Sequence, residues 1–336
     1  MKIWTSLAAV PGNQRSVVTI GNFDGMHFGH ARVVRTCVDR ARKLGVDSVA
    51  LTFDPHPKAV HVPDNPAPLI MSLATRLDAL ATTGLDATLV VHYDASVYTL
   101  TPEEFVAEFL VDRLGAVEVV VGEDFRFGRK NEGDINTLHA LGRRFGFTVA
   151  MVTDVAGKSG RRWSSSWVRE LLAEGKVDEA AEVLGHPYRL VGVVEHGEKR
   201  GRELGFPTAN LRGGPGVLTP ADGVYAGWVV RDVSGQPSAQ EFLPAAISVG
   251  TNPQFSGKMH TVEAHVLGRD DLDLYGQKIA VVFTKRIRPM MKFGSVDELK
   301  EQMDEDLRET ASVLGGRVAA RVEPGKVRAG ETTRRR

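Results

Sequence analysis

Residues 17–30, VVTIGNFDGMHFGH, run from an apolar stretch through a glycine-rich turn to a pair of histidines. The β-branched residues 17–20 are typical of a buried strand. Beyond the histidines, apolar residues recur with a 3.6-residue period from Val33 to Leu44, which predicts a helix. The turn therefore joins a strand to the start of a helix. Its glycines permit a tight turn and a close approach of the backbone to a ligand.

The first half of the chain repeats this strand-then-helix pattern. Further short apolar runs lie at residues 49–53, 88–91, 117–121 and 148–152. Between two of them, residues 101–104, TPEE, form a capping-box pattern with proline at the first helical position. Uninterrupted apolar strands that alternate with helices predict a doubly wound α/β fold, in which helices cover both faces of a parallel sheet. Such sheets bind ligands at the carboxyl ends of their strands.

The pattern changes near Gly185, after which helix-length periodic segments become scarce. Strand candidates follow at residues 188–194, 224–230, 245–249, 261–267 and 279–283. Many strands with turn signals between them indicate an antiparallel barrel or sandwich. One amphipathic helix from Ser295 to about Leu314 closes this part, and Glu298 gives it another capping-box pattern. We therefore expect domains at residues 1–185 and 186–320, with a disordered tail at 321–336.

The bulk composition excludes several classes of protein. The 336 residues carry 42 basic and 42 acidic side chains, so no chain-wide positive field attracts nucleic acid. Three arginines, residues 334–336, could bind nucleic acid locally but are more typical of a solvated terminus. The single cysteine, Cys37, excludes an internal disulfide and fits a cytoplasmic setting. The apolar stretch near the start is too short for a signal peptide or a membrane span, so we expect no membrane partner.

Two histidines, His27 and His30, stand three residues apart across a glycine. At the start of a helix, both could point at one phosphate group, where backbone N–H groups and the helix dipole also favour negative charge. As hydrogen-bond donors they could stabilise charge that develops during phosphoryl chemistry. A surface turn is the plain alternative. A zinc site is another, although no third ligand stands at a recognisable spacing.

The run from Gly21 to His30 resembles the HxGH motif of the nucleotidyltransferase superfamily. In this longer form it is similar to the adenylyltransferase module of prokaryotic FAD synthetases. Three more stretches match that family in order: TFDPHP at 52–57, GEDFRFG at 122–128 and WSSSWVR at 163–169. Trp163 and Trp167 depart from the family, which usually has an aliphatic residue and a small or polar one there.

The resemblance implies roles for these residues in adenylyl transfer. Catalytic roles fall to His27, His30 and Arg169, and ATP or its phosphates would contact Gly21, Phe23, Gly25, Ser164 and Ser165. The serines precede a predicted helix, so their hydroxyls could cradle phosphate or simply cap the helix. Arg169, one turn later, could hold the pyrophosphate bidentately. Asp124, Phe125 and Phe127 could hold a nucleotide or flavin ring, with core packing an equal alternative for the two phenylalanines.

A second glycine-rich stretch, HGEKRGRELGFPTAN at residues 196–210, follows the first strand of the second domain. Its glycines Gly197, Gly201 and Gly205 alternate with basic residues such as Arg202, an arrangement that binds phosphate. A basic surface hairpin is the alternative. Thr208 and Asn210 would face the same way in an extended segment, and both offer the oxygen ligands that Mg²⁺ prefers.

The string GFPTAN resembles the corresponding segment of riboflavin kinases, whose fold is a small antiparallel β-barrel. In that family the threonine and asparagine contact the magnesium bound to ATP, which implies that role for Thr208 and Asn210. The family's catalytic glutamate matches Glu263, which would be the general base. Arg288 and Phe293 lie near where such kinases contact the flavin, although Phe293 could instead pack on the closing helix.

The joint resemblance covers residues 15 to 314 and implies a bifunctional riboflavin kinase and FAD synthetase. Its substrates would be riboflavin, FMN and ATP, with Mg²⁺ as cofactor. One alternative is adenylyl transfer to another phosphate ester, such as nicotinamide mononucleotide or pantetheine phosphate. Another is a flavin-binding regulatory module that has lost its chemistry. The sequence does not indicate whether copies of the chain associate.

Overall fold

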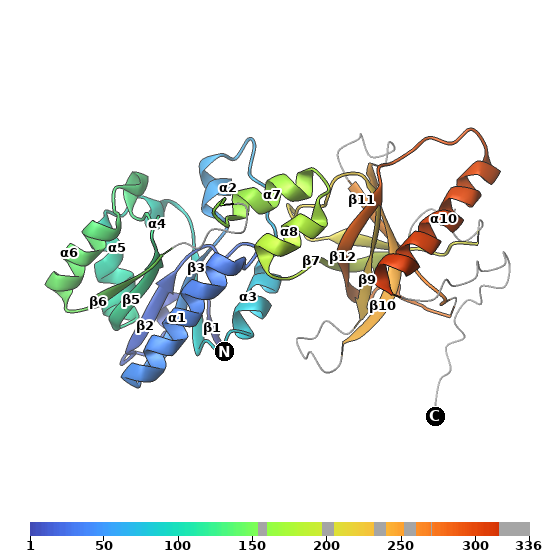
Figure 1. Ribbon diagram of the computed structural model, residues 1–336. Helices are drawn as coiled ribbons and strands as arrows, with labels where there is room; N and C mark the ends of the chain where they lie inside the picture. Colours follow the sequence, from blue (N-terminus) through green and yellow to red (C-terminus); the bar gives the residue numbers. More distant parts are fainter. Residues whose placement is uncertain (154–159, 197–204, 232–239, 252–259, 270, 316–336) are drawn as a thin grey trace, which may run out of the picture. The chain divides into compact units, whose positions relative to one another are not determined.

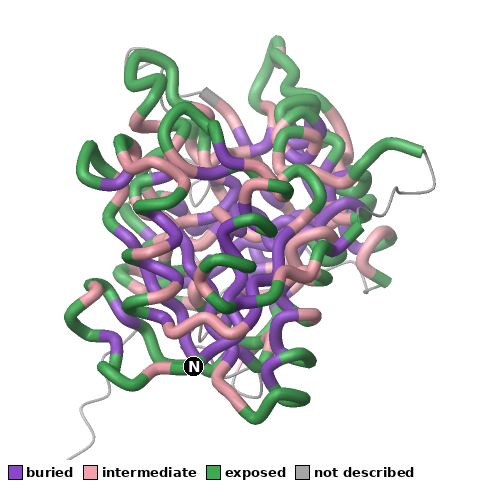
Figure 2. The backbone as a smooth tube through the Cα atoms, turned by 90° about the vertical axis from the view of Figure 1, so that its left-hand side faces the viewer, coloured by how far each residue is buried: buried purple, intermediate pink, exposed green. Residues whose placement is uncertain are grey.

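The computed structural model describes residues 1–153, 160–196, 205–231, 240–251, 260–269 and 271–315. The chain divides into two compact units, Met1–Ser165 and Ser166–Arg336. The tail expected at 321–336 lies outside the described residues. Figure 2 shows the buried residues in the interior and the exposed ones along the outer turns and loops of the backbone.

The first unit is built on a six-stranded sheet whose neighbouring strands are all parallel. Its strands are β1 (Lys2–Trp4), β2 (Ser16–Ile20), β3 (Asp47–Asp54), β4 (Ala87–His92), β5 (Ala116–Gly122) and β6 (Thr148–Val152). All five predicted strands are confirmed. The edge strand β1 was not predicted, because three residues carry too little pattern.

Helices cover both faces of this sheet (Figure 1). The helical segments of the unit are η1 (Leu7–Ala9), α1 (Phe28–Leu44), α2 (Pro57–His61), α3 (Leu73–Ala81), α4 (Ala95–Tyr98), α5 (Pro102–Phe105), η2 (Val106–Arg113), η3 (Arg129–Asn131) and α6 (Ile135–Phe145). One buried cluster joins α1 and α3 to the sheet, and another joins α5, η2 and α6 to its other face. Adjacent strand residues alternate between the clusters, as Val17 and Val18 do, which confirms the doubly wound arrangement.

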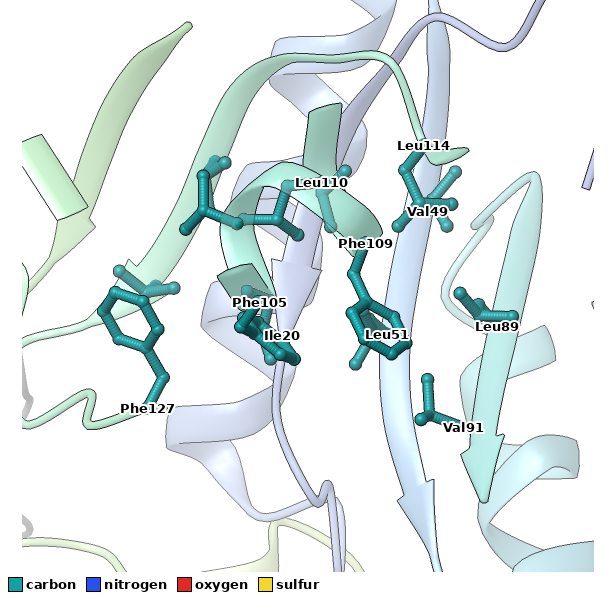
Figure 3. Close-up of a cluster of buried hydrophobic side chains, with 14 of the residues drawn as sticks. Ile20, Val49, Leu51, Leu89, Val91, Phe105, Phe109, Leu110, Leu114 and Phe127 are labelled. Carbon is teal, nitrogen blue, oxygen red and sulfur yellow. The ribbon is translucent and has the colours of Figure 1, made fainter. Parts of the chain in front are cut away.

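The helix predicted from Thr101 is present and begins with the expected capping box. The Thr101 side chain accepts from the Glu104 N–H, and the Glu104 carboxylate accepts from the Thr101 N–H at 2.8 Å. After one α-helical turn the segment continues as the π-helix η2. Figure 3 shows Phe105 and Phe109 from this segment packed against Leu51 and its neighbours in the core.

The strand order places β2 between β3 and β5. The chain leaves β2 toward β3 and β4 on one side and later returns to build β5 and β6 on the other. The connections therefore diverge at the carboxyl end of β2, and such a switch point is where α/β sheets bind ligands. The histidine loop, residues 21–30, follows β2 directly.

Among its described residues, the second unit contains a closed barrel and the helices α7, α8 and α10. Its strands, in barrel order, are β10 (Glu241–Thr251), β11 (His260–Val266), β8 (Ala209–Gly213), β7 (Tyr188–Glu195), β12 (Lys278–Arg288) and β9 (Gly223–Arg231). All pairs are antiparallel, so the barrel expectation is confirmed and the sandwich alternative is wrong. Helices α7 (Ser165–Ala173) and α8 (Val177–Leu184) precede the barrel, and α10 (Val296–Leu314) follows it.

Helix α10 has the predicted bounds and packs on β9, β10 and β12. Ser295 caps it by accepting from the Glu298 N–H at 3.1 Å. The Glu298 carboxylate accepts from the Gly294 N–H rather than from Ser295, so the reciprocal bond of the predicted box goes one residue further back.

The single cysteine, Cys37, lies on the inner face of α1 with no exposed surface. Its Sγ contacts the carbonyl oxygen of Val17 at 3.2 Å. Burial raises the pKa of this thiol to about 12, so it stays protonated at neutral pH.

Candidate active sites

The loop after β2 has an unusual backbone. Gly25 has φ of 90°, and the non-glycine residues Phe23 and Met26 have φ of 49° and 45°. Bulky side chains rarely adopt this left-handed region, and such residues are concentrated at functional sites. Phe23 and Met26 are both buried, and their side chains belong to the core cluster under α1. Gly21 packs closely on the Phe23 ring, since a Cβ at Gly21 would lie 3.1 Å from it.

The loop ends with the two histidines in direct contact. Their rings stack with centroids 3.7 Å apart and planes at 22°. His27 is the N-cap of α1, and its Nδ1 accepts from the backbone N–H of His30 at 3.4 Å. A Cβ at Gly29 would lie 3.0 Å from the His27 ring, so the glycine between the histidines leaves room for the stack. The structure thus brings both predicted catalytic histidines to the start of a helix, where first-turn N–H groups lack intrahelical partners.

The electrostatics of His27 favour its neutral form. The pKa of His27 falls from 6.5 to about 4, first because burial disfavours the charged ring and second because Arg162 is nearby, while Asp124 acts in the opposite direction. At neutral pH the ring therefore carries one proton. Because Nδ1 accepts a hydrogen bond, that proton resides on Nε2, which is left to donate to a ligand.

Polar contacts fasten the histidine loop to its surroundings. The buried carboxylate of Asp24 accepts from the N–H groups of Ile70 and Met71 at 3.0 to 3.1 Å. The carbonyl oxygen of Asp24 accepts from the Ser165 hydroxyl at 2.7 Å. The predicted phosphate-binding serine Ser165 therefore lies against the loop that carries the histidines.

The serine segment differs from the expectation in one detail. Helix α7 begins at Ser165, so Ser164 precedes it, as predicted, but Ser165 lies within its first turn. Arg169 follows one turn later on α7, in the second compact unit, and its contact with the histidine loop stays a prediction.

Arg162, which the sequence alone does not mark, forms an ion pair with Asp124, a residue predicted to contact the flavin. Nη2 of Arg162 lies 2.6 Å from Oδ1 of Asp124. Both side chains are exposed, and Arg162 influences the pKa of His27. Trp163, the next residue, packs on Phe28 at the start of α1, with ring centroids 4.8 Å apart. Trp163, where the family usually has an aliphatic residue, thus forms an aromatic contact between the serine segment and the start of α1. No local pattern marks Arg162, because its importance depends on a partner far away in sequence.

The two predicted flavin-contacting phenylalanines stack on each other with centroids 5.3 Å apart. Phe127 is buried and belongs to the core cluster, next to Phe105 in Figure 3. Its side chain therefore packs in the core, which was the alternative to flavin contact. Phe125 is half-buried at the border of that cluster.

A second group of rings lies nearby and was not predicted. Phe53 and Tyr93, at the carboxyl ends of β3 and β4, are in edge contact at 5.4 Å. The Tyr93 hydroxyl lies 2.9 Å from Nε2 of the exposed His61. Aromatic residues are common throughout this chain's core, so only the sheet topology distinguishes these rings from packing residues.

In the barrel, the proposed base and metal ligands face one another. Glu263 on β11 is directly opposite Asn210 on β8, so their side chains project from the same face of the sheet. The Thr208 hydroxyl donates to the Glu263 carboxylate at 3.4 Å. All three side chains are partly exposed, while their neighbours Ala209, Leu211, Val262 and Ala264 are buried. The structure therefore brings together Asn210 and Glu263 from two neighbouring strands and Thr208, the residue before β8.

A buried histidine holds the segment that carries Thr208. Nδ1 of His265 lies 2.8 Å from the carbonyl oxygen of Pro207, and its ring packs edge-on against Phe206. Burial lowers the pKa of His265, so the ring is neutral and donates its Nδ1 proton to that oxygen. His265 is on the same strand as Glu263, and it thus fixes Thr208 opposite the base. The sequence alone does not predict this role, since an isolated histidine in a strand carries no pattern.

A pocket at the end of the barrel opens beside Thr208. Its lining residues are Val194, Pro207, Thr208, Ala209, Ala264, Val266, Arg269, Leu272, Leu274 and Tyr275. The ring of Tyr275 stacks on His196, with centroids 4.0 Å apart. Gly205, two residues before the lining residue Pro207, has φ of 91°. The other predicted phosphate-binding residues, Gly197, Gly201 and Arg202, fall outside the described residues.

Arg288 makes extensive contacts within the protein. Its Nε and Nη2 donate to the two carboxylate oxygens of Asp306 on α10, each at 2.7 Å. The same guanidinium lies 5.8 Å from the Phe293 ring centre. These contacts connect β12 to α10, and the predicted flavin contacts of Arg288 and Phe293 stay predictions.

The donor set in the barrel fits a hard divalent cation. Hydroxyl, amide and carboxylate oxygens are the ligands that such ions prefer. Within the described ranges, no three His, Cys, Asp or Glu residues gather into a metal-binding group. The metal-ligand roles predicted for Thr208 and Asn210 stay predictions.

Comparison with known proteins gives matches to both halves of the chain. The family model described as FAD synthetase matches residues 10–167, and the one described as riboflavin kinase matches residues 184–314. The bifunctional riboflavin kinase/FMN adenylyltransferase of Escherichia coli K12 is 37% identical over 292 residues, which cover 86% of this chain and 90% of the relative. The enzyme of that name from Bacillus subtilis is 32% identical and covers 88% of this chain and 91% of its own.

A solved structure is similar across both units. It is a protein of Streptococcus pneumoniae described as a macrolide-efflux protein, with a TM-score of 0.81 and 32% identity, and the match covers 92% of this chain and 97% of that one. For the present chain, no helix among the described residues has the length and apolar character needed to span a membrane.

Proposed function

The chain belongs to the family of bifunctional riboflavin kinases and FMN adenylyltransferases, and we propose which of its residues carry out each reaction. It phosphorylates riboflavin to FMN with ATP, and it transfers an adenylyl group from ATP to FMN, which gives FAD and pyrophosphate. Adenylyl transfer belongs to the segment matched by the FAD synthetase model and the kinase reaction to the segment matched by the riboflavin kinase model. We keep the predicted functional boundary at residue 185, one residue after the start of the riboflavin kinase match at 184.

In adenylyl transfer, an FMN phosphate oxygen attacks the α-phosphorus of ATP and pyrophosphate leaves. We assign the stabilisation of the α-phosphate to His27, which donates from Nε2, and to His30 stacked against it. First-turn N–H groups of α1 add further donors. Because His27 is neutral, it contributes a directed hydrogen bond rather than a full positive charge. Fixed donors of this kind accelerate reactions by about 100- to 1000-fold each.

We assign the remaining contacts of this site by position. Ser164 and Ser165 bind ATP phosphates next to the histidine loop, and Gly21, Phe23 and Gly25 shape that loop. Arg169 holds the pyrophosphate. Asp124 and Phe125 contact the flavin, together with the rings of Phe53 and Tyr93 at the same edge of the sheet.

In the kinase reaction, the ribityl 5′-hydroxyl attacks the γ-phosphorus of ATP. We assign proton removal to Glu263, whose carboxylate is partly exposed opposite Asn210. Both reactions use ATP, and enzymes of this kind typically need a divalent metal. We propose Mg²⁺, which would neutralise phosphate charge while Thr208 and Asn210 hold it on the Glu263 face. The pocket beside Thr208 then takes the nucleotide.

The use of ATP and the single cysteine also bear on where in the cell the enzyme works. We propose that the enzyme works in the cytoplasm, where ATP is available and where its single, buried cysteine needs no oxidising compartment.

The observation that supports this proposal is that His27 and His30 stack at the start of α1 in the first unit, while Thr208 contacts Glu263 opposite Asn210 in the second. A timed assay with riboflavin, ATP and Mg²⁺ tests it by separating riboflavin, FMN and FAD. FMN should appear first and FAD later. In His27→Ala, FMN should accumulate with little FAD. A wild-type chain that binds flavin but forms neither product would instead support a regulatory module.

A further inference from the structure

Arg76 is a buried cation that the proposed chemistry does not use. It belongs to α3, is 3% exposed and lies under the histidine loop rather than in a substrate-accessible position. A buried guanidinium requires hydrogen-bond partners, because leaving the charge unsatisfied is costly. The identity of those partners therefore indicates what the residue holds in place.

The hydrogen-bond partners of Arg76 are backbone oxygens of the histidine loop and of the carboxyl end of β3. Its Nη1 donates to the carbonyl oxygen of Asn22 at 2.8 Å, and its Nη2 donates to that of Phe53 at 3.1 Å. Asn22 follows β2 and Phe53 lies near the end of β3. A longer contact of 3.7 Å joins Nη2 to the Asp54 carboxylate. One planar side chain thus connects the carboxyl ends of two neighbouring strands.

The connection at Asn22 is adjacent to the strained part of the loop. The next residue, Phe23, has φ of 49° and is almost completely buried. Strained backbone persists only where surrounding contacts enforce it. The ring of Phe23 makes an edge contact with His30, with centroids 5.6 Å apart. A chain of contacts therefore leads from Arg76 through Asn22 and Phe23 to one of the two histidines.

The approach to α3 supports the same loop at a second point. Asp24 accepts the N–H groups of Ile70 and Met71, six and five residues before Arg76 in the chain. Residues 70–76 thus hold Asn22 and Asp24 on either side of Phe23.

We propose that Arg76 is a positioning residue for adenylyl transfer, which acts by fixing the backbone at Asn22 so that Phe23 holds His30 against His27. This inference rests on the adenylyltransferase activity proposed for the first unit. Arg76 does not contact the reacting atoms. Its loss should therefore lower the rate of the chemical step while substrate binding is largely kept.

The test compares Arg76→Met, which keeps the length but removes the donors, with Arg76→Lys, which keeps one cationic donor group. Arg40→Met is the control, because it removes an arginine from α1 whose ion pair, at 2.7 Å, is with the buried Glu118 carboxylate rather than with the backbone of the histidine loop. For each protein, kcat and KM of FAD formation are measured from FMN, with FMN formation on the same chain as internal reference. Thermal unfolding is recorded in parallel.

We expect Arg76→Met to lower kcat for FAD formation by about 100-fold, the effect of a small misplacement of reacting groups. KM for FMN and ATP and the kinase rate should change little, and Arg76→Lys should restore part of kcat. Arg40→Met should lower thermal stability without a comparable loss of kcat. If Arg76→Met fails to fold, Arg76→Lys and Arg76→Gln provide the same comparison.

Two results would overturn the inference. Arg76→Met could be less stable and yet keep its kcat, which would make the residue purely structural. It could also raise KM with kcat intact, which would make Arg76 a substrate-binding residue. A wild-type chain that forms no FAD would instead overturn the underlying function.

Discussion

The imidazole rings of His27 and His30 lie face to face at 3.7 Å, and Nδ1 of the first accepts the backbone N–H of the second. A cap of this kind serves two purposes. It satisfies one of the free N–H groups at the start of α1, and it fixes which nitrogen of His27 carries the proton. The local structure that begins the helix therefore also prepares the proposed donor.

Gly29→Ala should separate activity from stability. Alanine favours helix by about 1 kcal/mol over glycine, so helix propensity alone would leave the unit as stable or more stable. The added Cβ, however, would lie 3.0 Å from the His27 ring, so the ring would have to shift within the stack by a few tenths of an ångström. We expect FAD formation to fall at least 10-fold, with FMN formation unchanged. Gly12→Ala is the control, because a Cβ there meets nothing within 4 Å; equal activity of the two variants would contradict the steric argument.

The stability of the first unit should decrease on mild acidification because of His27. Its pKa is about 4 when folded and 6.5 when exposed, so between these values the unfolded chain binds the extra proton. The stabilisation is complete above pH 6.5 and is lost as the pH falls toward 4, for a total of roughly 3 kcal/mol. Denaturant unfolding of wild type and His27→Gln at pH 7 and 5 measures it. Between pH 7 and pH 5, the free energy of unfolding should fall more for the wild type than for His27→Gln. His139 is exposed on α6, so His139→Gln should lose as much stability as the wild type.

Glu263→Gln should block FMN formation while FAD formation from supplied FMN survives. The amide keeps the size of the side chain but cannot accept a proton, and general-base catalysis contributes about 100- to 10,000-fold. Initial rates of the two half-reactions, measured separately, test this. Glu301→Gln on the exposed side of α10 serves as the control. Loss of both activities in Glu263→Gln would contradict two independent sites.

Thr208→Val should raise the metal concentration that the kinase needs. The substitution keeps the shape but removes the hydroxyl that now donates to Glu263. We expect the Mg²⁺ concentration for half-maximal FMN formation to rise several-fold, while the metal dependence of FAD formation stays the same. Thr261→Val is the matched control, since that hydroxyl donates only to the main chain at Gly250 among the contacts described. An unchanged Mg²⁺ dependence would remove Thr208 from the proposed ligands.

The sequence predicted those features that depend on short-range pattern. Every β-branched run forms a strand, and the histidine loop and Ser295 begin helices as expected. The strands β1 and β8 were missed for a physical reason. Lys2–Trp4 is too short to show alternation, and Ala209–Gly213 is a strand because β7 and β11 pair with it. Their structure depends on partners that lie far away in the chain.

Site residues, too, could be predicted from the sequence only where a short-range motif marks them. The histidines and Thr208 lie in local motifs and could be named from them, whereas Glu263 was named only from the family resemblance. Arg76, Arg162 and His265 act through Asn22, Asp124 and Pro207, at separations of 54, 38 and 58 residues for these contacts. Supporting contacts of this kind become visible only when the backbone places the two residues together.

The single thiol gives the molecule an internal reporter. Cys37 is fully enclosed between α1 and the sheet, and its proton is tightly held. A thiol reagent in solution should therefore modify the protein only when the first unit opens, while opening of the barrel goes undetected. The labelling rate would measure how often one half of the enzyme unfolds, without truncation, added probes or separation from the other half.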